Sequence, residues 1–397
     1  MNKIDLVKIV PRRINTKFTN KSYSLNLAYS GEYILISRRK IKGSDGYIEK
    51  RIRIPKNYFC VWYKWPCGKN QNSDENNGVR FNYLILPRYI PLDELTLVSL
   101  GLLEAEMEVS VPNSSQISFT NCEPNLINLI IKFFERIGIK PTCWKWYIAF
   151  NFKLLNLESY QTTKMREELA KNFWMKNTFI SPFMKIKKVF IYTGNRRNLN
   201  FDPDTIRRGT LKISYYNIIL RKIILELLKE IKKTILKRKD KTMVKNYIRG
   251  IIAGEGSVKL SKSGAIDSVA IGSMNSFNKR FFRKCLKILG IKPSKDQKNC
   301  CGINNKENFF KIYKLGLFDL NKTRYRKFLI GLSRFRRFLK METEIERRFM
   351  LIKKEIINKI IELEPEIIER DRLFGETSGI YSMAGERKGR NRVFIRR

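Results

Sequence analysis

A glycine-containing helical stretch, Tyr247 to Ser257 (YIRGIIAGEGS), constrains the fold of this chain more than any other segment. Its apolar residues follow a helical period, and Gly250 and Gly254 lie four residues apart, on one helix face. Each glycine inside a helix costs about 1 kcal/mol relative to alanine, so close approach of a second backbone is the usual reason for keeping two. Glu255 follows at the helix end, where the macrodipole is already negative and a bound cation would stabilise a carboxylate. The stretch predicts a packed helix pair with a cation site; a buried amphipathic helix with an incidental glutamate is the alternative.

A second copy of this pattern lies upstream, at Leu97 to Met107 (LVSLGLLEAEM), in a helix for which Asp93 is the expected N-cap. The corresponding positions in the two copies are Gly101 and Gly250, Ala105 and Gly254, and Glu106 and Glu255. A Gly-Ile-Lys-Pro sequence also follows each copy, starting 32 residues after Glu106 and 35 residues after Glu255. A duplicated unit of this length, with the acid in register, indicates an internal repeat.

The two copies resemble the LAGLIDADG homing endonucleases, in the single-chain form with two motifs, and the resemblance covers roughly residues 92 to 339. It implies an α+β fold of two pseudo-symmetric αββαββα units that pack through their motif helices, and a monomer. The helix contacts would be made by Gly101, Ala105, Gly250 and Gly254. Glu106 and Glu255 would be metal ligands and catalytic residues, with Mg²⁺ or Mn²⁺ as the cofactor. The first copy departs from the family pattern at Met107, where glycine is usual, and at Glu104, an additional acid.

The charge of the chain favours a polyanionic partner. Lys and Arg total 80 against 37 Asp and Glu, a formal net charge of +43, which is too unbalanced for ion pairing alone. Nucleic acid is therefore the expected partner. In the resemblance, strand residues enter the DNA major groove, and the expected DNA-binding residues are Lys145, Lys153, Lys187, Lys259, Lys262, Lys298 and Arg324. Lys212, also on an expected strand, and Lys322 are the expected lysines that stabilise transition-state charge.

Several other classes of protein are excluded or disfavoured. The chain contains no histidine, which excludes Ser-His-Asp and Cys-His triads and Cys/His zinc fingers. Its seven cysteines include no C-x-x-C pair and favour buried thiols in a reducing, cytoplasmic environment. No signal peptide and no run of 18 apolar residues is present, so no membrane association is expected.

Composition and periodicity divide the chain into four predicted parts. Residues 1–88 form a β-rich accessory region, 89–240 the first half with an insertion at about 156–205, 241–340 the second half, and 341–397 a charged helix with a basic tail. The aromatic, basic strand at Tyr58 to Trp65 has two interpretations: a surface that stacks on bases or the core of a β-sandwich.

The sequence hypothesis is thus site-specific, metal-dependent cleavage of double-stranded DNA. Two alternatives stay open: a splicing maturase that binds intron RNA, and a non-cleaving DNA-binding regulator on the same scaffold. Both acids are present, and a pure binder has no reason to keep two adjacent carboxylates against phosphates, so the nuclease is favoured.

Overall fold

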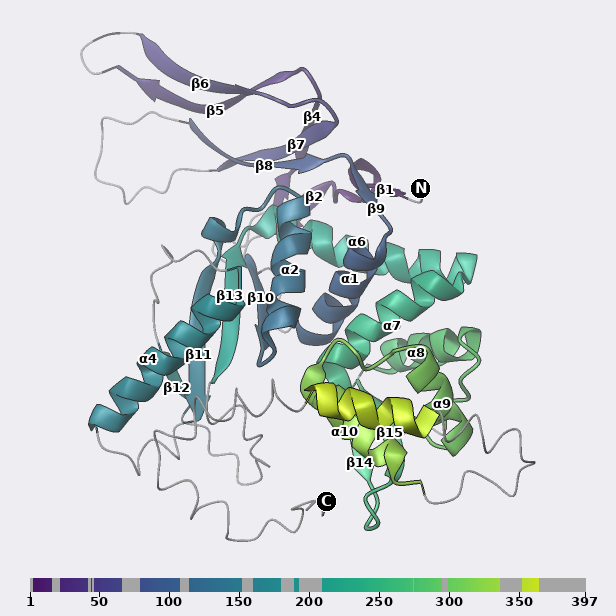
Figure 1. Cartoon of the computed structure of the whole chain (residues 1–397). Helices are drawn as coiled ribbons and strands as arrows, with labels where there is room; N and C mark the ends of the chain where they lie inside the picture. The colour runs from purple at the N-terminus through teal and green to yellow at the C-terminus, as the bar shows by residue number, and fades with distance from the viewer. Residues whose placement is uncertain are drawn as a thin grey trace.

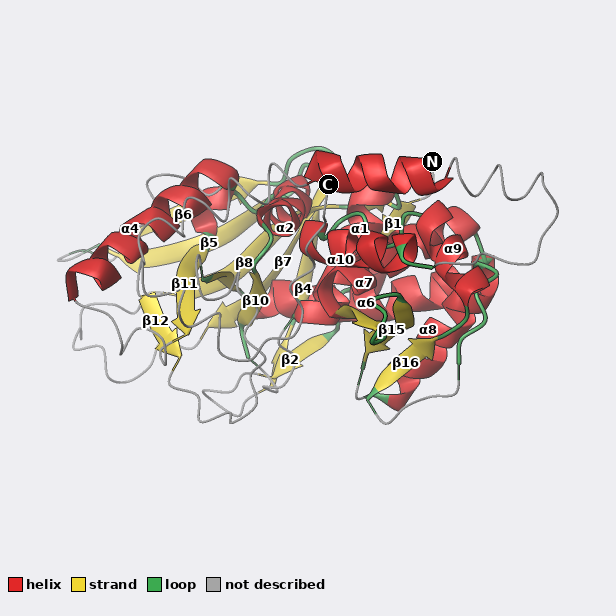
Figure 2. Cartoon of the chain, turned by 60° about the horizontal axis from the view of Figure 1, so that its bottom comes forward, coloured by secondary structure: helices red, strands yellow, loops and turns green. Residues whose placement is uncertain are grey.

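The structure is a computed structural model that describes residues 3–15, 22–41, 44, 46–65, 79–107, 114–151, 160–179, 189–192, 209–273, 275–294, 299–335 and 352–363. Figure 1 shows an N-terminal sheet at one end and the two motif helices near the centre. Two further sheets lie on either side of these helices, as Figure 2 shows from below. The architecture is mixed α+β, as predicted.

The two motif helices, α1 (Glu94–Glu106) and α7 (Lys241–Glu255), pack directly against each other through their small residues. A Cβ atom built on Gly250 would lie 3.0 Å from Gly101 Cα and 2.9 Å from Leu102 N, and closer still to the Val98 carbonyl. Further along, a Cβ on Gly254 would lie 2.6 Å from Ala105 Cβ. Gly250 meets Gly101 and, one turn later on both helices, Gly254 meets Ala105, so α1 and α7 run in the same direction. There is no room for a larger side chain at Gly250 or Gly254.

Replacing Gly250 tests this contact. Helix propensity alone predicts that Gly250→Ala raises stability by about 1 kcal/mol. We expect the opposite sign, because the added Cβ meets backbone atoms of α1 that have no free rotation to escape it. Gly250→Leu should cost about 1–3 kcal/mol or more, and unfold or separate the two halves. Calorimetry measures both effects, and an unchanged melting temperature would show that Gly250 is not at a helix contact.

The first half builds a four-stranded sheet in the order β10-β13-β11-β12. Its strands are β10 (Gln116–Asn121), β11 (Lys145–Asn151), β12 (Val189–Tyr192) and β13 (Thr210–Tyr216). Apolar residues alternate toward the helices, where Ile117, Phe119 and Ile213 are fully buried. The helices of this half are α2 (Pro124–Arg136), α4 (Tyr160–Asn177) in the predicted insertion, and α6 (Ile218–Arg238). Residues 109–111, whose alternation of apolar and polar residues predicts a further strand, lie outside the described residues.

The second half contains, among its described residues, a three-stranded sheet in the order β14-β15-β16. The strands are β14 (Gly256–Leu260), β15 (Ile266–Gly272) and β16 (Cys300–Ile303), and the helices are α8 (Ser276–Ile288), α9 (Lys306–Lys314) and α10 (Lys322–Ser333). The two sheets therefore differ in their described extent, and the pseudo-symmetry of the halves stays a prediction.

The N-terminal region is β-rich, as predicted. A five-stranded sheet has the order β4-β7-β8-β5-β6, and the shorter strands pair as β2-β3 and β1-β9. The bounds are β1 (Lys3–Asp5), the 3-10 helix η1 (Leu6–Ile9), β2 (Arg13–Asn15), β3 (Ser22–Ser24), β4 (Asn26–Tyr29), β5 (Tyr33–Lys40), β6 (Tyr47–Arg53), β7 (Tyr58–Trp65), β8 (Val79–Pro87) and β9 (Tyr89–Pro91).

The aromatic strand β7 belongs to the core rather than to a base-stacking surface. Phe59, Val61 and Tyr63 are at most 1% exposed and join the same hydrophobic core as the motif helices. Cys60 faces the other way, into a smaller core with Ile34, Ile36 and Ile54. Because β1 pairs with β9 across residue 88, the predicted boundary there is bridged by strand pairing, and the division into four parts stays a prediction.

At the other end of the chain, residues 352–363 are helical, within the part from residue 341 onward that is predicted to contain a charged helix. Three of the cysteines, Cys60, Cys285 and Cys301, are buried as expected, whereas Cys143 is exposed. Every helix in the described segments is too short or too polar to cross a lipid bilayer.

Candidate functional site

The two predicted acids lie at equivalent places, since Glu106 is the last residue of α1 and Glu255 the last residue of α7. The parallel packing of these helices brings both ends together. A Cβ on Gly254 would lie 3.0 Å from Glu106 Cγ and 3.4 Å from its Oε1, so the Glu106 side chain covers the end of α7. Glu106 is half-buried and Glu255 is exposed. The fold thus places two carboxylates beside each other at one helix junction.

The backbone after each acid has the same conformation. Met107 has φ −73° and ψ 125°, and Gly256 has φ −72° and ψ 140°. Both are extended values that any residue adopts. Met107, which departs from the family pattern, is therefore compatible with the helix end, and its side chain is buried in the core. Gly256 is required for a different reason, because a Cβ there would lie 2.7 Å from Ile252 Cγ2.

Both acids have raised pKa values, and burial is the largest cause for each. Burial, and then the charge of Glu255, raise the pKa of Glu106 to about 7, against the opposing effect of Arg324. Partial removal from water raises the pKa of Glu255, and Arg324 again opposes the shift. Two carboxylates at the negative end of a helix repel each other and the helix dipole, so this junction favours bound cations or protons.

Arg324 is a basic residue whose charge acts on both acids of this junction. Its guanidinium donates hydrogen bonds to the carbonyl oxygens of Ile252 at 3.1 Å, Ala253 at 2.7 Å and Gly254. The Asn321 side-chain amide also donates to the Ala253 carbonyl, at 3.2 Å. The carbonyls at the end of α7 are thereby satisfied by α10, and Arg324, which the sequence predicted as DNA-binding, has a structural contact with the helix that ends in Glu255. In the sequence, the one indication of this role is that Arg324 follows Asn321 by three residues, because asparagine commonly caps the N-terminus of a helix.

The donor set at the junction fits a magnesium-type ion. Mg²⁺ is usually held by one or two carboxylates, with waters and substrate phosphates completing its shell. Glu106 and Glu255 supply such a pair of hard oxygen ligands. Across the described segments no cluster of three or more His, Cys, Asp or Glu side chains forms a closed metal site, so a metal here would need water and phosphate as further ligands.

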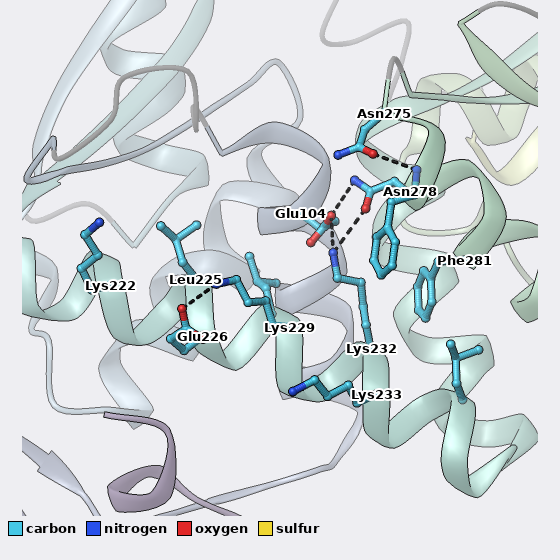
Figure 3. Close-up of a pocket in the computed structure, with 13 residues that line it drawn as sticks. Glu104, Lys222, Leu225, Glu226, Lys229, Lys232, Lys233, Asn275, Asn278 and Phe281 are labelled. Carbon is cyan, nitrogen blue, oxygen red and sulfur yellow. Dashed lines mark hydrogen bonds and ion pairs between the residues drawn. The ribbon is translucent and has the colours of Figure 1, made fainter. Parts of the chain in front are cut away.

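Glu104, the additional acid of the first motif, does not belong to this pair. Its Oε1 accepts hydrogen bonds from Lys232 Nζ at 2.9 Å and from the Asn278 side-chain amide at 2.8 Å. The two charged side chains are 9% and 12% exposed, so this is a buried ion pair. It lies beside a cavity of about 780 Å³ between α6 and α8 (Figure 3). Glu104 thus links α1 to α6 and α8.

The first sheet presents a polar face on the side away from its core. Lys212 on β13 lies opposite Thr120 on β10 and Tyr147 on β11. Residues that lie opposite each other on neighbouring strands face the same side of a sheet. Lys145 lies 4.8 Å from the ring centre of Tyr216 on this face. The Tyr147 and Tyr216 hydroxyl oxygens are 3.4 Å apart, and burial together with this hydrogen bond raises the pKa of Tyr147 to about 12. Tyr147 and Tyr216 were not among the sequence-predicted residues, although their alternation with buried residues would have identified them.

The remaining predicted residues that the structure describes lie between residues 241 and 340. Lys259, exposed on β14, forms an ion pair with Asp267 at 3.2 Å, and Lys262 is exposed in the following turn. Lys322 is the first residue of α10, next to the Asn321 cap. Lys153, Lys187 and Lys298 lie outside the described residues.

The raised pKa of Glu106 gives a pH prediction for the metal-free protein. Its pKa rises on folding from 4.5 to about 7, so folding favours the protonated form. The contribution of the Glu106 carboxyl to the free energy of unfolding is fully present below pH 4.5 and is lost as the pH rises through 7. We expect the melting temperature in EDTA to fall from pH 5 to pH 8, and Mg²⁺ to restore it above pH 7. Glu106→Gln should flatten this dependence, whereas Glu226→Gln on α6 should not. Parallel curves for wild type and Glu106→Gln would contradict the assignment.

Comparison with known proteins adds little. No protein-family model and no curated protein matches the sequence. Among solved structures, a variant of I-DmoI in complex with its target DNA and magnesium aligns with a TM-score of 0.30 and 12% identity, covering 56% of this chain and 96% of that chain. I-DmoI in complex with DNA and manganese aligns with a TM-score of 0.29 and 12% identity, covering 57% and 98%. Similarity at this level identifies neither a family nor an activity.

Proposed function

We propose that this protein is a LAGLIDADG-type homing endonuclease, which cleaves double-stranded DNA at a specific site by metal-dependent phosphodiester hydrolysis. The observation that carries the proposal is the junction of α1 and α7. Gly101 and Gly250 let the two helices touch, and the helices end side by side in Glu106 and Glu255. A protein with a net charge of +43 has little use for adjacent carboxylates facing a polyanion unless cations neutralise them.

Each candidate residue has a distinct role in this proposal. Glu106 and Glu255 would hold Mg²⁺ or Mn²⁺, which when bound activates a water and stabilises the leaving 3′ oxygen. Arg324 keeps the end of α7 in place and offsets part of the negative charge there. Lys212 and Lys322 are the proposed residues that stabilise charge on the scissile phosphate. No histidine is required.

The polar faces of the two sheets are the proposed DNA contacts. A two-sheet surface with residues such as Lys145, Tyr216 and Lys259 can enter the major groove, where base edges are distinguishable. Because both halves lie in one chain, we propose that a monomer acts on an asymmetric duplex site. The maturase and the non-cleaving regulator remain the competing proposals, and they differ in the need for the two acids.

A cleavage screen tests the function directly. The full-length protein is incubated with a randomised duplex library and Mg²⁺, and the new DNA ends are sequenced. We expect ends enriched at one sequence with Mg²⁺ or Mn²⁺ and none in EDTA. A protein that retains duplex fragments on a filter but produces no ends with either metal would support the regulator instead.

A further inference from the structure

One face of the β5–β6 hairpin packs into the smaller core of the N-terminal sheet, and the opposite face is exposed to solvent. Ile34, Ile36 and Ile54 are buried in the smaller core with Ala28 and Cys60. Successive side chains of a strand point to opposite faces, so residues 47, 49, 51 and 53 of β6 share the other face. Register pairs Tyr33 with Arg53 and Leu35 with Arg51. A bulge between Leu35 and Ser37 then brings Arg38 opposite Glu49, onto the same face.

This surface, called here the ribbon face, consists of Tyr33, Leu35, Arg38, Tyr47, Glu49, Arg51 and Arg53. It carries three arginines against one acid. The Arg38 guanidinium lies 3.9 Å from the ring centre of Tyr47, and that of Arg53 lies 5.9 Å from the ring centre of Tyr33. Glu49 lies 3.5 Å from Arg38 and 2.7 Å from Arg51, which leaves two net positive charges. Tyr33 is 66% exposed, the most exposed large hydrophobic side chain in the described part of the chain.

Protection of an edge strand does not account for the ribbon face. Charged residues on an edge strand prevent sheets from pairing with other chains, and β6 is an edge strand. That purpose requires charge but not exposed aromatic rings under arginines. Exposed rings interleaved with cations are typical of surfaces that bind unpaired nucleic acid, because bases stack on rings and guanidinium planes while phosphates meet the positive charges.

The ribbon face lies away from the two acids. The chain runs from β8 through β9 into the start of α1, and Glu106 is at the other end of this 13-residue helix, about 20 Å further on. Figure 1 places β5 and β6 at the end of the molecule opposite to β14 and β15. The ribbon face is therefore remote from Glu106 and Glu255, and a ligand bound there need not be a duplex held at these acids.

We propose that the ribbon face binds single-stranded nucleic acid, with unpaired bases stacking on Tyr33 and on the Arg38–Tyr47 pair and with phosphates at Arg51 and Arg53. Stacking, not base-edge hydrogen bonding, supplies the main contact, so the face tolerates many sequences. This binding goes beyond the proposed cleavage and does not require it.

The test uses two double variants of the full-length protein that each remove one ring and one charge. Tyr33→Ala with Arg53→Gln alters the ribbon face. Tyr216→Ala with Lys145→Gln alters the equivalent cation–aromatic pair on the first sheet, which we assign to duplex DNA. Fluorescence anisotropy at fixed salt measures binding of a labelled 20-nucleotide single strand, as DNA and as RNA, and of a 20-base-pair duplex.

We expect the ribbon variant to lose between about fivefold and a hundredfold in single-strand affinity, the range for one stacked base, and to bind duplex within twofold of wild type. The first-sheet variant should instead lose duplex affinity and bind the single strand within twofold of wild type. Tyr33→Phe with Arg53→Lys should retain binding, because ring and charge persist. The ratio of the affinity lost for RNA to that lost for DNA identifies which of the two nucleic acids the ribbon face prefers. Unchanged single-strand affinity, or an equal loss on the duplex, would overturn the proposal.

Discussion

Glu255→Gln is expected to abolish Mg²⁺-dependent cleavage and to leave duplex binding within a few-fold of wild type. Glutamine has the same size as glutamate but lacks the negative charge that a hard divalent ion requires. Loss of a metal that activates water and stabilises the leaving oxygen should reduce the cleavage rate on the order of 10³-fold or more, equivalent to about 4 kcal/mol. Glu255 is exposed, so the substitution should not disturb the core.

Two measurements separate chemistry from folding in this experiment. The melting temperature of Glu255→Gln should equal that of wild type or exceed it, since a repulsive neighbour of Glu106 is removed. Glu226→Gln, which alters a surface ion pair on α6, is the matched control and should cleave like wild type. Unchanged cleavage by Glu255→Gln would remove the nuclease proposal, whereas lost binding would place Glu255 in the DNA contact itself.

The motif helices could be predicted from local pattern because their determinants are local. Asp93 accepts a hydrogen bond from Thr96 N at 3.0 Å, as its predicted N-cap role requires. The glycines at positions 101 and 250 were predicted to allow close approach of a second backbone, and each faces the other helix. The last turn of each helix, ending in its acid, followed from the same periodicity.

The contacts around the junction could not be predicted, because they join residues distant in sequence. Lys232 pairs with Glu104 across 128 positions. Arg324 reaches the end of α7 across about 70. Arg249 binds both Glu94, at 2.7 Å, and Asp319, at 3.0 Å, and ties α7 to the start of α1 and to the segment before α10. No spacing rule relates such pairs. The ribbon face was missed for a related reason, since a single bulge decides which face Arg38 occupies.

Affinity for duplex DNA should fall steeply with salt. A chain with a net charge of +43 and polar faces on two sheets should neutralise many phosphates and release their counterions. The slope of log K against log salt is about −0.9 per phosphate contacted on duplex DNA, so roughly six to ten contacts would weaken binding by about 10³ to 10⁵ between 50 and 200 mM salt. A titration by anisotropy measures the slope. A slope shallower than about −2 would mean that few phosphates are contacted, contrary to the two-sheet surface.

Salt dependence alone does not distinguish a nuclease from a maturase, because both bind phosphates, but competition does. Side chains on the two sheets can read the wide major groove of B-form DNA, whereas the major groove of A-form RNA is too deep and narrow for them. Unlabelled duplex DNA should therefore displace a labelled duplex better than folded intron RNA of equal length at matched salt. RNA held by the ribbon face would not change this order, since that face lies at the other end of α1 from Glu106 and Glu255. If folded RNA competes tenfold better than duplex, the sheets themselves bind RNA. The maturase would then be the better proposal, and the paired glutamates would have no catalytic role.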